Sequence, residues 1–177
     1  MVTKDNIAII IPFHKNVEML RLSIHTLEES IKGEKPQIII IANNNNPNEL
    51  NLSEYEFAQY DIYKIPENLF WPGAINLGAR QTDKQYLLFC DPDIFYTENW
   101  LDNLLDCYNR HKNVGVVSAK IINPLNNRIM DFGMGYNQFN TIHIGKDLPF
   151  NHPTTLDDRK VQAACGAVFL TSHESKE

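Results

Sequence analysis

Two carboxylates, Asp91 and Asp93, stand one residue apart directly after the apolar run at residues 86–90. That run has the length and composition of a strand buried on both faces of a parallel sheet. Side chains alternate along an extended chain, so both carboxylates would project to the same side, and Pro92 would stop further strand pairing. Two like charges in one small volume favour a bound cation, and oxygen ligands with open positions suit Mg²⁺ or Mn²⁺ that also holds phosphate groups. The spacing therefore predicts a metal that binds a diphosphate.

A purely structural interpretation of the same residues is that Asp91 caps a turn while Asp93 is solvated. An isolated pair of this kind would favour that interpretation. The position immediately after a buried strand favours the metal site instead.

Polar side chains also follow two other strongly apolar runs. His14 comes just after residues 7–11, which Pro12 is expected to end, and an asparagine run at 43–46 follows residues 38–41. In a parallel sheet the carboxyl ends of the strands lie at one edge, where such folds bind ligands. We therefore expect His14, the asparagine run and the two aspartates to share one rim.

The segments between these runs have helical periodicity. Asn16 is expected to cap a helix whose apolar residues recur through Ile31, Pro72 lies in the first turn of a helix over 72–81, and Thr97 is expected to cap a third helix. Residues 60–65 and 114–119 are expected to form further strands, the latter buried. Strands alternating with helices predict an α/β fold with a mostly parallel central sheet flanked by helices.

The pattern changes from Ile121 onward. Residues 128–131 and 140–144 are expected to be short antiparallel strands, 145–160 a polar loop, and 161–170 a last apolar element. We expect one domain over residues 1–177, with an α/β half at 1–120 and a less regular region at 121–177.

Composition narrows the class of protein. The chain has 177 residues, 43% of them hydrophobic, and a formal net charge of -6, so a nucleic-acid partner is not expected. Three cysteines without metal-like spacing indicate a reducing compartment, and we expect a cytoplasmic protein. No run is long enough to span a membrane, although peripheral association with a membrane stays open.

The ordered motifs resemble family 2 of the nucleotide-sugar glycosyltransferases, which have the GT-A fold. Residues 7–14 resemble the family's opening strand, residues 68–78 are similar to its N-x-G-x-x-x-A-x-N-x-G segment, and residues 86–93 are similar to the strand that ends in D-x-D. Residues 165–170 resemble the G-A element beside the donor and acceptor pocket. The resemblance runs along most of the chain, and it implies that residues 1–120 form a donor-binding half and residues 121–177 part of an acceptor side.

The resemblance implies roles for individual residues. Asp93 would coordinate Mn²⁺ or Mg²⁺, and Asp91 would face the nucleotide ribose or the water shell of the metal. Pro12 and His14 would lie near the base or ribose, and Gly73 and Asn76 near the donor, although Asn76 is as well explained by orienting the loop before the D-x-D strand.

One position departs from the family pattern. The carboxylate that usually ends the second strand and touches the base matches Ala42 here. Asn43 or Asn44 is the expected substitute, because an amide offers both a donor and an acceptor to a pyrimidine edge.

The implied reaction moves a sugar from a nucleoside diphosphate to a saccharide or lipid-linked glycan acceptor, with the metal stabilising the departing diphosphate. The acceptor hydroxyl needs a general base, which the family usually places beyond the G-A element. Only Glu174 precedes the terminal acid there, in a different context, so the base is not identified and the chain looks truncated on its acceptor-binding side. The alternative is a non-catalytic or truncated nucleotide-sugar-binding module.

Three further expectations concern other residues. An aspartyl-phosphate phosphatase with Asp91 as nucleophile ranks last, because Ile94 and Phe95 follow Asp93 where that class has a Gly-Thr step. His143 and His152 are weak candidates for a third metal ligand. Trp71 is expected either to stack on a base or sugar or to pack its helix.

Overall fold

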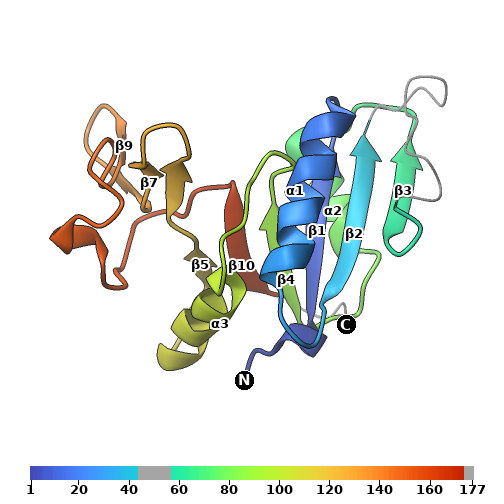
Figure 1. Ribbon diagram of the computed structural model, residues 1–177, viewed down its shortest axis with the longest axis horizontal. Helices are drawn as coiled ribbons and strands as arrows, with labels where there is room; N and C mark the ends of the chain where they lie inside the picture. The colour runs from blue at the N-terminus through green and yellow to red at the C-terminus, as the bar shows by residue number, and fades with distance from the viewer. Residues whose placement is uncertain (44–56, 174–177) are drawn as a thin grey trace.

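A six-stranded sheet forms the centre of the computed structural model, which describes residues 1–43 and 57–173 (Figure 1). Its strands are β1 Ile7–Phe13, β2 Gln37–Asn43, β3 Asp61–Ile65, β4 Tyr86–Cys90, β5 Val116–Ser118 and β10 Val168–Ser172. They lie in the order β3-β2-β1-β4-β10-β5. β1 pairs in parallel with β2 and β4, and β2 with β3, whereas β10 is antiparallel to both of its neighbours. The predicted α/β fold with a mostly parallel sheet is confirmed.

Helices cover both faces of this sheet. They are α1 Val17–Ser30, α2 Phe70–Ala79 and α3 Trp100–Arg110, with short 3-10 turns η1 Lys4–Asn6 and η2 Pro153–Thr155. One core cluster joins α1 and α3 to Ile9 and Ile11 of β1, and a second joins α2 to Ala8 and Ile10. Alternate residues of β1 therefore face opposite helical layers, which explains why the strand is apolar without interruption.

Glycine permits the closest helix contact on the α2 side. A Cβ added to Gly78 would lie 2.4 Å from Cγ2 of Ile10 and 3.3 Å from Cγ1 of Ile41. A Cβ on Gly73 would lie 2.8 Å from the Cβ of Leu69 within the same region. The close packing at these two positions therefore depends on the absence of a side chain.

One of the three predicted helix starts is confirmed, and two are wrong. The side chain of Asn16 caps α1 by accepting a hydrogen bond from the Met19 N–H at 3.2 Å, as expected. Thr97 does not cap α3; the helix begins two residues later than that cap requires, and Asn99, with φ of 60°, takes the N-cap position. α2 begins at Phe70, two residues before the predicted start at Pro72. Asparagine tolerates the left-handed backbone that both caps adopt.

Three strand predictions need correction. β1 does not end at Pro12 but continues through it to Phe13. The predicted buried strand at 114–119 is the three-residue edge strand β5, whose Val116 is 41% exposed. Within the predicted element at 161–170 only the residues from Val168 onward form a strand, because β10 begins where pairing with β4 begins.

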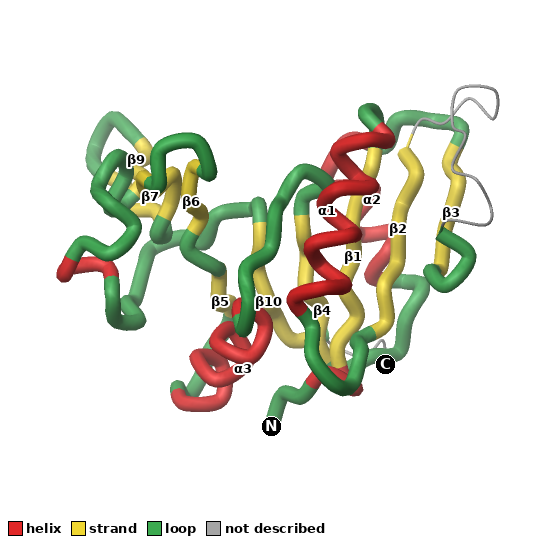
Figure 2. Tube along the Cα trace, viewed as in Figure 1, coloured by secondary structure: helices red, strands yellow, loops and turns green. Residues whose placement is uncertain are grey.

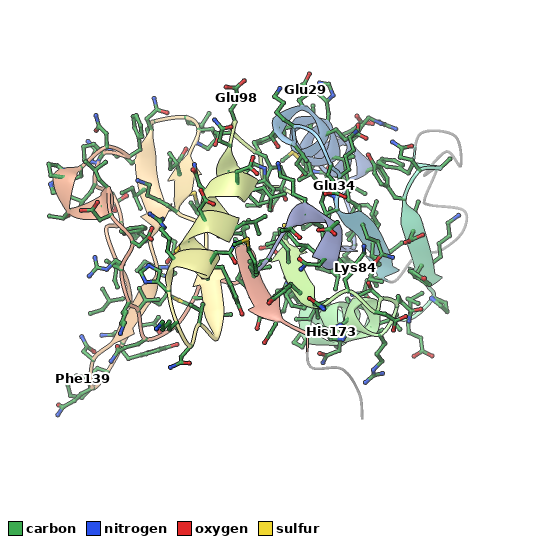
Figure 3. The ribbon with its side chains drawn as sticks, turned by 90° about the horizontal axis from the view of Figure 1, so that it is seen from below. Glu29, Glu34, Lys84, Glu98, Phe139 and His173 are labelled. Atoms are coloured by element: carbon green, nitrogen blue, oxygen red, sulfur yellow. The ribbon has the colours of Figure 1, made fainter. Side chains whose placement is uncertain are left out.

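Residues 121–143 form two small sheets beside the main one (Figure 2). β6 Ile121–Asn123 pairs with β7 Arg128–Asp131, and β8 Met134–Tyr136 pairs with β9 Thr141–His143, both antiparallel. The antiparallel strands predicted at 128–131 and 140–144 are present, but their partners β6 and β8 were not predicted. Phe139, in the β8–β9 connection, is 85% exposed and points away from the main sheet (Figure 3).

The three helices of the described residues are all too short or too polar to cross a membrane.

Candidate functional site

The carboxyl ends of β1, β2 and β4 meet at one edge of the sheet, because these strands are parallel neighbours. His14 follows β1, Asn43 ends β2 and Asp91 follows β4. A hydrogen bond of 2.9 Å joins Nδ1 of the half-buried His14 to the backbone carbonyl of Asn43. The structure thus brings the predicted polar residues of the first two strands into contact.

Asn43 holds the loop that leads into α2. Its side chain is 4% exposed, and its Oδ1 accepts a hydrogen bond from the Leu69 N–H at 2.7 Å. Its Nδ2 donates to Asn68 Oδ1 at 3.1 Å and to the Phe70 carbonyl at 3.3 Å. Phe70 has φ of 53°, an uncommon value for a bulky residue, so these contacts fix a strained backbone at the helix start. The geometry gives Asn43 a positioning role, and its contact with a base stays a prediction.

Trp71 links the start of α2 to Asp91. Its Nε1 donates a hydrogen bond of 3.0 Å to Asp91 Oδ1, and its ring lies 6.2 Å from the ring of Phe169 in β10. The ring is 37% exposed, so part of it faces solvent beside the carboxylate. The sequence pointed to this tryptophan but did not predict its bond to Asp91.

The G-A element lies directly against Asp91. The Asp91 N–H donates a hydrogen bond of 2.8 Å to the Ala167 carbonyl, and a Cβ on Gly166 would lie 3.8 Å from the Trp71 ring. The antiparallel pairing of β10 with β4 creates this neighbourhood. Residues separated by seventy or more positions in the sequence therefore share one site.

Asp91 carries a raised pKa. Burial raises it, the Trp71 N–H partly opposes the rise by stabilising the charged form, and the neighbouring charge of Asp93 adds to it. Asp93 itself is exposed. A divalent cation bound to both carboxylates would remove their mutual repulsion, and the two residues offer the oxygen donors that Mn²⁺ and Mg²⁺ prefer.

The sequence argument for a shared direction of Asp91 and Asp93 needs correction. Pro92 and Asp93 form a turn rather than an extension of β4, so strand alternation does not apply to them. Asp93 lies two positions after Asp91, and its charge raises the pKa of Asp91 further.

The remaining predicted site residues are placed as follows. Pro12 is buried within β1, Gly73 is half-buried in the first turn of α2, and Asn76 is exposed on the same helix. Asn44 and Glu174 lie outside the described residues. The roles of Pro12, Gly73 and Asn76 near the nucleotide sugar stay predictions.

The two histidine candidates have protein partners. His143 Nδ1 contacts Oδ1 of Asp131 at 2.7 Å, and His152 Nδ1 bonds the Thr154 hydroxyl at 2.9 Å in the cap of η2. The Asp131 side chain is 2% exposed and also accepts from the Gly133 N–H at 2.8 Å. The Asp131 carboxylate was missed by the sequence interpretation, because nothing in its local pattern marks it as buried.

Asp131 belongs to the surroundings of the rim. Burial raises the pKa of Cys165, and the charges of Asp131 and Asp91 raise it further. The thiol therefore lies within electrostatic range of both carboxylates, which connects the small sheets to the edge of the main sheet.

The chain matches a known protein family and is similar in sequence to a known protein. The model of the family described as "Glycosyl transferase family 2" matches residues 8–158. The minor teichoic acid biosynthesis protein GgaB of Bacillus subtilis (strain 168) is 27% identical over 124 residues, which cover 64% of this chain and 13% of that protein.

Two solved structures share the fold. The mannosyltransferase PcManGT from Pyrobaculum calidifontis, in complex with GDP-Man and Mn²⁺, has a TM-score of 0.55 at 14% identity and matches 71% of this chain and 39% of its own. Residues 1–349 of TarS from S. aureus give a TM-score of 0.54 at 15% identity, covering 65% of this chain and 35% of that one. The chain thus spans well under half the length of each of these proteins and has the fold of GT-A glycosyltransferases.

Proposed function

Because the chain belongs to glycosyl transferase family 2, we propose that it binds a nucleoside-diphosphate sugar at the rim formed by β1, β2 and β4 and takes part in transfer of the sugar. The acceptor class that we propose is a saccharide or a lipid-linked glycan in polysaccharide biosynthesis. The similarity to a teichoic acid biosynthesis protein supports this acceptor class. The observation that carries the proposal is the half-buried Asp91, held by Trp71 and Ala167 at the carboxyl end of β4 with Asp93 beside it.

Asp93 would hold the metal, and Asp91 would face the ribose or the metal's water shell. Mn²⁺ or Mg²⁺ supplies positive charge to the leaving nucleoside diphosphate. Asp91 fits this task because the Trp71 N–H holds one of its oxygens and leaves the other for a water or a hydroxyl. The complex of PcManGT with GDP-Man and Mn²⁺ supports the choice of ion.

The other residues of the rim would shape the nucleotide pocket. We propose that His14 and Pro12 lie near the base or ribose and that Gly73 and Asn76 lie near the donor. Asn43 would act mainly by fixing the loop before α2, since the two N–H donors of its amide are used there. Residues 121–177 would form part of the acceptor side. A cytoplasmic location is part of the proposal, and the free thiols of Cys90, Cys107 and Cys165 support it.

Titration calorimetry with a panel of UDP-, GDP- and dTDP-sugars tests donor binding. We expect at least one donor to bind in Mn²⁺ and to lose its affinity in excess chelator. Asp93→Ala should abolish this metal-dependent binding. Asp83→Ala is the matched control, because Asp83 is an exposed aspartate at the opposite end of β4 and should leave binding unchanged.

The proposal fails if no donor binds in a metal-dependent way, or if Asp93→Ala binds as the unaltered chain does. Turnover is a separate question, because no general base has been assigned. Donor hydrolysis or transfer that Asp93→Ala removes would show catalysis by this chain, whereas donor binding without either would support the binding-module alternative.

A further inference from the structure

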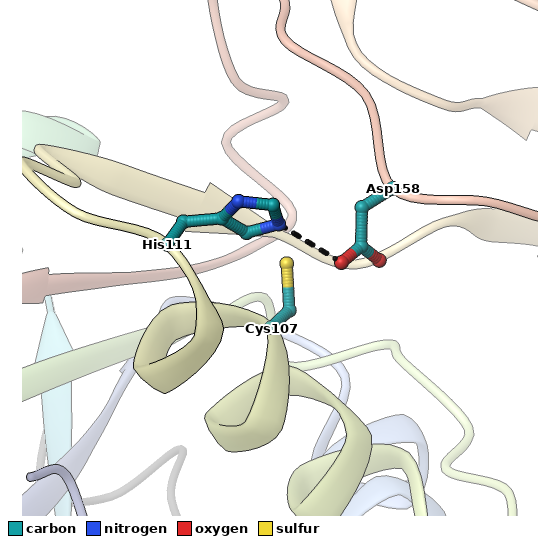
Figure 4. A group of neighbouring side chains, drawn as sticks. All are labelled: Cys107, His111 and Asp158. Carbon is teal, nitrogen blue, oxygen red and sulfur yellow. Dashed lines mark hydrogen bonds and ion pairs between the residues drawn. The ribbon is translucent and has the colours of Figure 1, made fainter.

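Three side chains with metal-binding atoms meet between the end of α3 and the segment that follows η2 (Figure 4). They are Cys107, His111 and Asp158, and one ligand atom from each lies within 4.8 Å of the other two. This cluster is separate from the carboxylates at the end of β4. It also differs from a group of exposed acidic side chains, because it combines a thiol, an imidazole and a carboxylate.

The first two ligands lie close together in the sequence. Cys107 lies in the last turn of α3, and His111, four positions later, is the C-cap residue with an extended backbone, so both ligands come from the C-terminal end of that helix. Leu104 and Leu105 of the same helix are buried in the core, and they fix its rotation. Cys107 is half-buried and His111 is exposed, so one ligand lies near the core and the other at the surface.

Asp158 comes from a distant part of the sequence and is held in place by α3. Its Oδ2 contacts Nη2 of Arg110 at 2.9 Å and Nε2 of His111 at 3.2 Å. Because both contacts use the same oxygen, the other carboxylate oxygen remains able to bind a ligand. Arg110 thus positions the carboxylate next to the thiol.

We propose that Cys107, His111 and Asp158 bind Zn²⁺, with water completing the coordination. Zinc accepts thiolate, imidazole and carboxylate ligands in a tetrahedral arrangement, and three protein ligands plus water form a common set. On binding, the Cys107 thiol releases its proton to solvent, and Nε2 of His111 gives its lone pair to the metal in place of its hydrogen bond with Asp158. The ion would tie α3 to the segment that leads to Cys165–Ala167 beside Asp91.

A nucleophilic cysteine assisted by histidine and aspartate explains the arrangement less well. In such a site the imidazole lies between thiol and carboxylate and uses one nitrogen toward each. Here Nε2 itself faces the carboxylate, and the three ligand atoms face one another around a common point (Figure 4). A simple surface ion pair would account for Arg110 and Asp158 but not for the imidazole and the thiol that contact the same carboxylate.

Zinc binding can be measured on the reduced, metal-free chain by competition with a chromophoric chelator. We expect one Zn²⁺ per chain, proton release on binding, and a loss of affinity of about tenfold or more in each of Cys107→Ser, His111→Ala and Asp158→Asn. With Co²⁺ in place of zinc, a thiolate-to-metal charge-transfer band should appear and should vanish in Cys107→Ser.

Matched variants separate this site from other sources of metal binding. Cys165→Ser, His25→Ala and Asp157→Asn remove the same residue types outside the cluster and should keep full affinity. Asp93→Ala should also keep it, so failure of the proposed donor site would leave this result intact. The proposal is overturned if the chain binds no zinc, if Cys107→Ser binds it as tightly as the Cys165→Ser control, or if the cobalt spectrum lacks the thiolate band.

Discussion

The hydrogen bond between Trp71 and Asp91 affects the pKa of the residue at the centre of the proposed donor site. Burial raises the pKa of Asp91, and the indole N–H works against that rise because it stabilises the carboxylate. Protons and the metal compete for the same carboxylate. The strength of metal-dependent donor binding should therefore depend on pH, and Trp71 should shift that dependence.

Trp71→Phe tests this role. The variant loses the N–H donor and keeps an aromatic ring against Phe169, so the pKa of Asp91 should rise further. Because a higher pKa means protonation at higher pH, metal-dependent donor affinity should begin to fall at a higher pH than in the unaltered chain. Calorimetric titrations over a range of pH measure the shift. Trp100→Phe is the control, since Trp100 Nε1 donates to Ser30 Oγ instead, and an equal shift in that variant would contradict the assignment.

The buried contacts of Asn43 lead to a prediction about the stability of the fold. Replacing it with alanine leaves the Leu69 N–H and the Asn68 side chain without their buried partner, in a loop that already holds the strained Phe70. We expect Asn43→Ala to lower the free energy of unfolding by about 1–3 kcal/mol. Asn76→Ala, on the exposed side of α2, should change it by no more than about 0.5 kcal/mol. Urea unfolding measures the free energy of unfolding of the two variants. Equal values would show that the loop contacts of Asn43 contribute nothing to stability.

At the scale of elements, the fit of α2 against the sheet depends on Gly78. A methyl group there would lie 2.4 Å from Cγ2 of Ile10, inside a core where Ile10 is fully buried. Overpacking costs about 1–3 kcal/mol, and the helix propensity of alanine returns up to about 1 kcal/mol of it. We expect Gly78→Ala to be net destabilising in denaturant titrations. Gly115→Ala, where an added Cβ meets nothing within 4 Å, should be close to neutral, and a Gly78→Ala chain as stable as this control would refute the packing argument.

Elements with strong local signals were predictable from sequence. The uninterrupted apolar runs of β1, β2 and β4 show that both faces are covered, and the Asn16 cap marks the start of α1. The small strands β6 and β8 carry only three residues each, too few for a periodic pattern. Their existence depends on pairing partners, and pairing is a tertiary property.

The candidate site was likewise only partly predictable from the sequence. Residues that end a strong strand, such as Asn43 and Asp91, were identified because parallel topology sends them to one rim. The bond from Trp71 to Asp91 and the contact between buried Asp131 and exposed His143 were not predicted, since each depends on how separate segments of the chain meet. Local sequence patterns predicted which strand ends form the rim. They did not predict the side-chain contacts that determine its electrostatics.

At the scale of the whole molecule, one strand connects the small sheets to the donor rim. The chain leaves the main sheet after β5, builds the two small sheets, and returns through residues 161–167 to β10, which pairs with β4. The segment 156–167, which follows η2, brings Asp158 to α3 and then places the Ala167 carbonyl against the Asp91 N–H. Anything that fixes the path near Asp158 therefore also stabilises the approach to Asp91.

The proposed zinc site would provide such a fixed point, with a measurable effect on stability. A ligand that binds only the folded chain stabilises it by about 2.7 kcal/mol at a free concentration of 100 Kd. For a chain of this size that corresponds to a rise in Tm of roughly 5–10 °C. Differential scanning calorimetry should show the rise with Zn²⁺ and not with Mg²⁺, and hydrogen exchange of backbone amides around Asp158 should slow. Cys107→Ser should lose both effects while Cys165→Ser retains them. A zinc-bound chain whose Tm and exchange rates match those of the metal-free chain would show that the ion does not hold the return path to α3.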